Sequence, residues 1–285
     1  MIPSTFDYVR PKTVDEAVAA LKQGGEDSKV ITGGQSMLPL LRMRLATPSI
    51  LVDCGRIDEM KGINESSDAI TIGAATTHHA VLTDSLVGKY AKLLALATAT
   101  VADSQVRHRG TFGGALAHGD PAGDLPAVAL VLNATMEIAG PGGRRKVLAK
   151  DFFVDYFTTA VGPDEVLVSI SIPKMDSDWG AHYEKFNRTA QGWAIVGVAT
   201  AVRRDGKKIA EARVGLTNVA PVPMRASKVE TALVGGDSAL ATIHKASELA
   251  AEGTHPTSDL HAAADYREHL MRVLTKRALA KAAGL

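Results

Sequence analysis

A pair of glycines lies between a short apolar stretch and a helix-like stretch near the start of the chain. Because glycine has no Cβ, such a pair lets the backbone turn tightly and approach a ligand closely. The amides of the turn and of the following helix start then face an incoming anion. The residues concerned are Thr32, Gly33, Gly34, Gln35 and Ser36. They predict a strand, a turn and a helix with an anion site, although a plain tight turn capped by Ser36 also explains them.

A second segment again combines a hydroxyl with two glycines, and it consists of Thr111, Phe112, Gly113, Gly114 and Ala115. Neither segment matches the Walker loop, which needs Gly-Lys-Ser/Thr, or the Rossmann pattern GxGxxG. Two such segments can hold a pyrophosphate from both sides through backbone amides, without any lysine. Together they favour a dinucleotide over a nucleoside triphosphate.

The chain has 285 residues, a formal net charge of +1 and one cysteine. The length predicts two or three domains. The near-zero charge makes nucleic acid and an anionic membrane poor candidate partners. Since Cys54 is alone, the chain by itself can form neither an intrachain disulfide nor a cysteine-ligated zinc or iron–sulfur site. The start is not leader-like and no apolar stretch reaches about eighteen residues, so we expect a cytoplasmic protein without membrane insertion.

Local patterns predict a first α/β region at residues 1–55. Thr13 and Glu16 form a capping box before a helix with an apolar face, which Gly24 and Gly25 end. Strands at 29–32 and 50–53 flank a helix over 37–45, with Pro39 in its first turn. This order of elements indicates a β-α-β-like unit.

Two further regions follow. Residues 56–176 predict a mixed α/β region with strands at 70–73, 135–139, 146–148 and 165–173, and with helices at 77–82, at 89–102 and from Asp124 onward. Residues 177–285 predict an α+β region, with strands at 181–188, 194–203 and 208–216, an Asp205-Gly206 hairpin turn, and helices at 227–234, 238–252 and 262–283.

Three motifs in a fixed order carry a resemblance to a known family. They are Gly-Gly-Gln-Ser at 33–36, Thr-Phe-Gly-Gly at 111–114, and Gly-Asp-Pro-Ala-Gly-Asp-Leu-Pro at 119–126. This order resembles the FAD-binding medium subunits of the molybdenum hydroxylases, which include the xanthine dehydrogenases, and within them the medium chain of the aerobic carbon monoxide dehydrogenase type. The resemblance extends to residues 183–186 and 215–220. It implies two α/β subdomains of the PCMH type that hold FAD and a C-terminal domain that covers the flavin end.

The resemblance also implies roles for individual residues. Both glycine segments would lie at the FAD pyrophosphate. Asp124 would contact the cofactor, although an N-cap explains it too, and Lys185 would lie near the isoalloxazine ring, although a solvated strand lysine explains it too. Trp193 would stack on the ring, with core filling as the alternative. No catalytic residue and no metal ligand are expected in this chain, and His78 and His79 are interpreted as a surface pair.

The sequence departs from the family pattern at three places. Gln35 stands where carbon monoxide dehydrogenases usually have histidine, and Ala115 stands where relatives often have Asn or Asp. Gln191 and Gly192 precede Trp193 where relatives often have Gly-Asp. None of these changes removes the backbone contacts expected for FAD, but they weaken carbon monoxide as the substrate.

The function that the resemblance implies is electron transfer by an FAD-carrying subunit. A small partner with two 2Fe–2S clusters would deliver electrons, a large partner with the molybdenum cofactor would oxidise the substrate, and an external acceptor would take the electrons. A dimer of heterotrimers is expected. The alternatives are a self-contained FAD oxidase, with an acid or base such as Lys185 or His118, and a scaffold without flavin. The substrate and the acceptor stay open, with NAD disfavoured because the chain lacks an NAD fingerprint.

Overall fold

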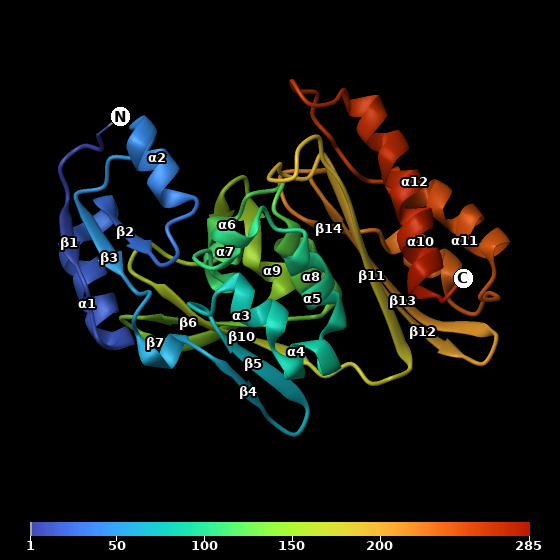
Figure 1. Cartoon of the computed structure of the whole chain (residues 1–285), viewed down its shortest axis with the longest axis horizontal. Coiled ribbons are helices and arrows are strands. Elements are labelled where there is room, and N and C mark those ends of the chain that lie inside the picture. The colour runs from blue at the N-terminus through green and yellow to red at the C-terminus, as the bar shows by residue number, and fades with distance from the viewer. Residues whose placement is uncertain (1) are drawn as a thin grey trace.

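The computed structural model describes residues 2–285, which form three larger sheets and one small hairpin. The sheets follow one another along the chain, and helices lie between and beside them (Figure 1). Three short 3-10 helices also occur, at Gly25–Asp27, Asp58–Met60 and Glu248–Ala251. Two α/β layers followed by an antiparallel sheet with helices confirm the predicted fold class.

The N-terminal lobe is a parallel three-stranded sheet with two helices. Its elements are β1 (Asp7–Val9), α1 (Val14–Gly24), β2 (Ser28–Ile31), α2 (Met37–Met43) and β3 (Ile50–Asp53), and the strand order is β1-β3-β2. Since all three strands are parallel, their carboxyl ends lie at one edge, where ligands bind in such sheets. The first glycine pair follows β2 at that edge.

The capping box of α1 forms nearly as predicted. The Thr13 hydroxyl accepts a hydrogen bond from the Glu16 amide at 3.1 Å, and the Glu16 carboxylate accepts one from the Lys12 amide at 2.7 Å. The apolar face of α1 is buried, and Gly25 ends the helix with a φ of +65°. Ser36 does not cap α2 through its side chain, so that expectation is wrong.

The middle of the chain is an antiparallel five-stranded sheet in the order β4-β5-β10-β6-β7, with its helices packed on it. Its strands are β4 (Ile63–Glu65), β5 (Ala69–Gly73), β6 (Thr135–Gly140), β7 (Gly143–Leu148) and β10 (Val166–Pro173). Its helices are α3 (His78–Thr83), α4 (Ser85–Tyr90), α5 (Lys92–Ala99), α6 (Ser104–Arg107), α7 (Phe112–His118), α8 (Asp124–Val131) and α9 (Ala149–Phe152). The hairpin is β8 (Phe153–Asp155) with β9 (Thr158–Thr159). The helix expected over 89–102 is two helices that meet at Ala91, and β4 was not predicted.

The C-terminal part is an antiparallel sheet in the order β11-β12-β13-β14, covered by helices. Its elements are β11 (Trp179–Phe186), β12 (Val196–Asp205), β13 (Lys208–Thr217), β14 (Met224–Arg225), α10 (Ser227–Leu233), α11 (Leu240–Ser247) and α12 (Ala264–Ala282). The predicted hairpin is confirmed: Asp205 pairs with Lys208, and Gly206 has a φ of +57°.

The C-terminal sheet lies between two sets of helices (Figure 1). Helices α5 and α8 pack on the side of the middle sheet, and α12 packs on the other side. The packing is close: a Cβ added to Gly215 would lie 2.7 Å from the carbonyl oxygen of Ala127 in α8. The boundaries predicted at 55 and 176 fall between sheets, but they stay predictions because one hydrophobic core continues from Val14 to Ala201.

Within residues 2–285, none of the helices combines the length and the apolar character that a bilayer crossing needs.

Candidate functional site

The fold brings the two glycine segments into direct contact. The hydroxyl oxygens of Thr32 and Thr111 are 2.9 Å apart. A Cβ on Gly33 would lie 2.2 Å from the carbonyl oxygen of Arg109, and a Cβ on Gly114 would lie 3.1 Å from the Thr32 hydroxyl. A side chain at Gly33 would therefore push the chain just before the second segment away, and one at Gly114 would crowd the Thr32 and Thr111 hydroxyls. The two segments, about 80 residues apart in the sequence, therefore lie side by side, and their shared role as one cofactor site stays a prediction.

The first segment has four consecutive amides that are free to bind a ligand. Among residues 2–285, the amides of Gly33, Gly34, Gln35 and Ser36 donate no hydrogen bond to a protein acceptor. Gly34 has a φ of +75°, which turns the chain and which a side chain would strain. Because successive amides in a turn form a concave anion site, the first segment can hold phosphate oxygens. This conclusion rests on the turn, since α2 has only 7 residues and a short dipole.

The second segment differs from this expectation, because it is the first turn of α7 and its amides from Phe112 to Ala115 are already bonded within the protein. Thr111 is the N-cap, and its hydroxyl accepts a hydrogen bond from the Gly114 amide at 3.1 Å. The amides of Phe112 and Gly113 donate to the carbonyls of Thr76 and Ala74, and the amide of Ala115 donates to that of Thr111. The second segment therefore contributes a threonine hydroxyl and close packing, and its four amides from Phe112 to Ala115 are occupied.

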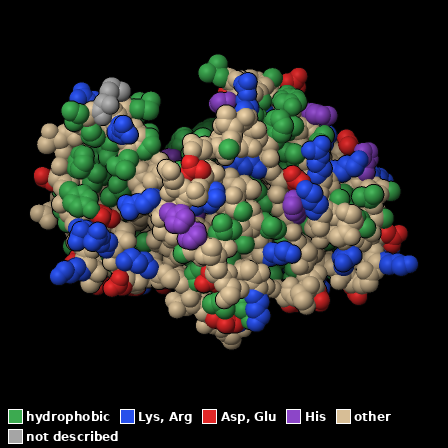
Figure 2. Space-filling view, in the orientation of Figure 1, with side chains coloured by type: hydrophobic (Ala, Val, Ile, Leu, Met, Phe, Trp, Pro, Cys, Tyr) green, Lys and Arg blue, Asp and Glu red, His purple; other side chains and the backbone are tan. Residues whose placement is uncertain are grey.

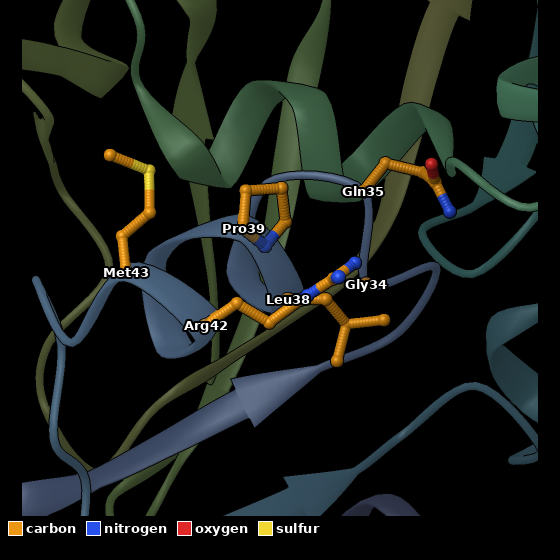
Figure 3. Close-up of a pocket in the computed structure, with 6 residues that line it drawn as sticks. All are labelled: Gly34, Gln35, Leu38, Pro39, Arg42 and Met43. Carbon is orange, nitrogen blue, oxygen red and sulfur yellow. The ribbon is translucent and has the colours of Figure 1, made fainter. Parts of the chain in front are cut away.

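A hollow of about 400 Å³ lies beside the first segment, on α2. Figure 3 shows its lining, with the Arg42 side chain running along the helix toward Leu38 and Gly34. Leu38 and Met43 are 46% and 58% exposed, so the wall presents apolar surface to solvent. In Figure 2 the molecule is notched at the top of the view, between the lobe that carries α2 and the rest. The hollow combines an apolar wall with one guanidinium next to four free amides.

Asp124 and Lys185 form a buried ion pair at the contact between α8 and β11. The Lys185 ammonium is 2.8 Å from the Asp124 carboxylate, and both side chains are at most 5% exposed. Tyr183 donates a hydrogen bond to the same carboxylate at 2.7 Å, and Lys185 also donates to the carbonyl of Thr100 at 3.1 Å. Burial raises the pKa of Asp124, although the neighbouring ammonium opposes this shift.

Two alternatives for this pair are wrong. Asp124 is not an N-cap, since α8 begins at Asp124 and its N-cap is Gly123, without a side-chain bond. Lys185 is not a solvated strand lysine, since it is buried and paired. Neither side chain lines the hollow on α2 or a second hollow, which lies beside Trp193 in the C-terminal part. Direct contact of either with a flavin stays a prediction.

Trp193 lies at a second hollow, of about 680 Å³, in the C-terminal part. The indole is 56% exposed, so the alternative that it fills the core is wrong. The hollow is also lined by Asp120, just after the end of α7, and by Asn218, Asp259 and Arg267. Because α7 has 7 residues, it spans about 10 Å at 1.5 Å per residue. One short helix therefore separates the second hollow from the contact between the glycine segments.

The histidines near the glycine segments differ in burial and in the groups that they contact. His118 is 4.0 Å from Asp120, and burial lowers the pKa of this histidine. His78 is only 4% exposed, and burial lowers its pKa to about 4, so the interpretation as a surface residue is wrong. The ring of His79 stacks on that of His108 at 3.9 Å. In residues 2–285 no three His, Cys, Asp or Glu side chains are grouped to hold a metal ion.

Asn218 and Arg267 at the second hollow were missed in the sequence, although each left a signal. Asn218 lies inside the stretch 215–220 that carried part of the family resemblance. Arg267 shares the buried face of α12 with Leu270 and Leu274, so it places a charge on an apolar stripe. A charged residue at such a position is almost never buried without a specific partner.

Comparison with protein families assigns nearly the whole chain. The FAD-binding domain of molybdopterin dehydrogenases matches residues 4–175, and the C-terminal domain of the CO dehydrogenase flavoprotein matches residues 181–282. The chain is 39% identical to the carbon monoxide dehydrogenase medium chain of Hydrogenophaga pseudoflava over 279 residues, which cover 98% of this chain and 97% of that one.

Solved structures are similar over the whole chain. One is carbon monoxide dehydrogenase from Hydrogenophaga pseudoflava that lacks the Mo-pyranopterin moiety of the molybdenum cofactor, with a TM-score of 0.97 and 40% identity. Another is quinoline 2-oxidoreductase from Pseudomonas putida 86, with a TM-score of 0.95 and 36% identity. In both cases the match covers 100% of this chain and 99% of the other.

Proposed function

The chain belongs to the family of FAD-binding medium subunits of molybdenum hydroxylases, and on this premise we propose that it is the FAD-carrying electron-transfer subunit of such a complex. Bound FAD supplies a centre that accepts electrons one at a time from iron–sulfur clusters and passes them to an external acceptor. The residues of this chain bind the cofactor, orient it and shield it. The observation that carries the proposal is the set of four free amides from Gly33 to Ser36.

We assign the pyrophosphate to these amides. Backbone donors neutralise phosphate oxygens without a lysine, and the Thr32 hydroxyl stands beside them, held 2.9 Å from Thr111. Thr111 to Ala115 take part through this hydroxyl and through the packing that glycine permits at 113 and 114. The donor set and the two glycine contacts fit the pyrophosphate of a dinucleotide.

We assign the two ends of FAD to the two hollows. The hollow on α2 offers apolar side chains and the Arg42 guanidinium, which suit a purine next to phosphate. The hollow at Trp193 is larger, and an exposed indole suits stacking on the isoalloxazine ring. Asp124 of α8 and Lys185 of β11 line neither hollow, and their ion pair joins the middle of the chain to the C-terminal sheet.

The iron and the molybdenum are assigned to partner chains. Cys54 is fully buried, and burial raises the pKa of its thiol to about 12, so it supplies no thiolate ligand. The relative from Hydrogenophaga is named a medium chain, which supports a small iron–sulfur subunit and a large molybdenum subunit beside it. We propose a dimer of such heterotrimers, located in the cytoplasm.

The substrate is assigned to the large partner and not to this chain. Similar proteins are named for carbon monoxide and for quinoline, so the similarity of the medium chain extends across different substrates. A self-contained oxidase would need a free acid or base at the ring. The Lys185 ammonium is instead paired with the Asp124 carboxylate and hydrogen-bonded to the Thr100 carbonyl. The His118 ring packs against that of Phe157, with ring centroids 5.2 Å apart.

The test is purification of this chain from cells that also express the proposed iron–sulfur and molybdenum subunits. We expect a yellow protein with FAD, together with one iron-containing and one molybdenum-containing chain. We also expect the flavin of this complex to be bleached by substrate, whereas the FAD-loaded chain alone is not. Substrate oxidation by the chain alone would support the oxidase, and a colourless lone protein that binds no added FAD would support the scaffold.

A further inference from the structure

The backbone directly after Trp193 is held by side chains from two other segments. The Asn218 side-chain amide donates to the carbonyl of Ala194 at 2.7 Å and to that of Ile195 at 3.4 Å. The Arg267 guanidinium also donates to the Ile195 carbonyl. The Ile195 amide donates to the Phe186 carbonyl at 2.8 Å. The chain is therefore fixed where β12 begins, while the indole before it stays 56% exposed.

Arg267 connects this anchor to another wall of the hollow. Its side chain is 1% exposed and forms a 2.6 Å ion pair with Asp259, in the segment that leads into α12. Its Nε has no hydrogen-bond partner among the described residues, so burying the guanidinium here is costly. Arg267 therefore joins two parts of the lining of one hollow, Ile195 through its carbonyl and Asp259 through its carboxylate.

Asn218 connects the anchor to the side of the hollow formed after α7. Its own amide donates to the carbonyl of Pro121 at 2.8 Å, next to Asp120 and Ala122 in the lining. The backbone of Asn218 has a φ of +62°, a left-handed conformation that asparagine adopts more readily than most residues other than glycine. In this conformation the side-chain amide of Asn218 donates to Ala194, and its backbone amide donates to Pro121.

We propose that Asn218 and Arg267 are positioning residues that fix Trp193 at the mouth of the hollow, ready to stack on a flat aromatic ring there. The inference rests on the proposed function for the identity of that ring, the isoalloxazine of FAD. The two side chains act through the carbonyls of Ala194 and Ile195 and do not themselves need to touch the cofactor. A preorganised aromatic loses less freedom on binding and so binds its ring more tightly.

The test uses Asn218→Gly in a Trp179→Phe background, so that Trp193 is the single tryptophan. Glycine removes the amide donor and relieves the strain at φ +62°, so folding is preserved. The matched control is Asn133→Gly, which relieves the same kind of strain at φ +50° away from the hollow. We expect lower Trp193 fluorescence anisotropy in the apoprotein and FAD binding weaker by about threefold to tenfold, the equivalent of one hydrogen bond. Binding of ADP, which has no flavin ring, should match the control.

Arg267 gives a second, independent readout. Arg267→Met should lower the anisotropy of Trp193, and Arg267→Lys should restore part of it. If Arg267→Met does not fold, the Asn218→Gly comparison decides alone. The inference is overturned if Asn218→Gly and Asn133→Gly have the same anisotropy and the same FAD affinity. If the parent protein binds no FAD, the proposed function fails, while the anisotropy comparison still decides whether Asn218 holds Trp193.

Discussion

Gly33 is the position at which one added methyl group should do most damage to the site. A Cβ there would lie 2.2 Å from the Arg109 carbonyl oxygen and 2.7 Å from the Gly110 Cα, whereas ordinary contact begins at 3.4 Å. Because these neighbours are backbone atoms, no side chain can swing away, and the two segments must separate by roughly 1 Å. The hydroxyl contact between Thr32 and Thr111, now 2.9 Å, would then be lost.

The cost of Gly33→Ala combines overpacking with one lost hydrogen bond. Overpacking in a close-packed interior costs about 1–3 kcal/mol and a hydrogen bond about 1 kcal/mol, so the free energy of unfolding should fall by about 2–4 kcal/mol. Urea unfolding of the apoprotein measures this change. Calorimetric titration with FAD should show a Kd at least about tenfold higher. A loss of about 1.4 kcal/mol in binding free energy, caused by the displaced amides, is enough for this factor of ten.

The matched control is Gly88→Ala, in α4, where an added Cβ meets nothing within 4 Å. Alanine is favoured over glycine inside a helix by roughly 0.5–1 kcal/mol, so the control should be as stable as the parent or more so. If Gly33→Ala unfolds at the same urea concentration as the control and binds FAD equally well, the two segments do not pack as described.

Three further predictions concern buried groups. Lys185→Met leaves the Asp124 carboxylate buried without its cation and should lower the free energy of unfolding in urea by about 3–5 kcal/mol; a smaller loss in the double variant Asp124→Asn/Lys185→Met is expected, and an equal or larger one would contradict the pairing. The pKa of His78 is about 4 in the folded protein and about 6.5 in the unfolded chain. The stability that goes with burying the neutral imidazole is therefore fully present above pH ~6.5, and the free energy of unfolding falls by about 1.4 kcal/mol per pH unit as the pH drops toward 4. His78→Gln should flatten this slope in urea unfolding across that range, and an unchanged slope would refute the assignment. Thr111→Val removes the cap of α7 and should cost about 0.5–2 kcal/mol, whereas Thr111→Ser should restore most of the melting temperature; equal melting of both variants would show that the hydroxyl does not cap.

Patterns that depend on neighbours in sequence were predicted well. The capping box at Thr13, the buried face of α1 and the Asp205-Gly206 hairpin all follow from local rules, and the structure contains them. The family resemblance likewise rested on short motifs in order, and it is confirmed over the whole chain. The contact between the Thr32 and Thr111 hydroxyls is consistent with the expectation that both segments belong to one site.

What depends on distant neighbours could not be predicted. Asp124 stands two residues before a proline, which suits an N-cap. Its partners Tyr183 and Lys185 come from β11 of the C-terminal sheet, about 60 residues later in the sequence. The amides after Thr111 look free in the sequence, yet the carbonyls of Thr76 and Ala74 accept two of them through tertiary contact. Burial could not be predicted either: His78 stands near a predicted helix start and is interpreted from the sequence as a surface residue, but it is 4% exposed and packs against Gly110.

The central claim is that this chain holds one complete FAD, with the pyrophosphate on the free amides from Gly33 to Ser36 and a hollow for each end. Titration of the apoprotein with FAD and with FMN, followed by calorimetry, tests it most directly. Since FMN lacks the adenylate half, we expect one FAD per chain and FMN binding at least about a hundredfold weaker, a difference of about 2.7 kcal/mol. No binding of FAD, or equal affinity for FMN, would contradict it.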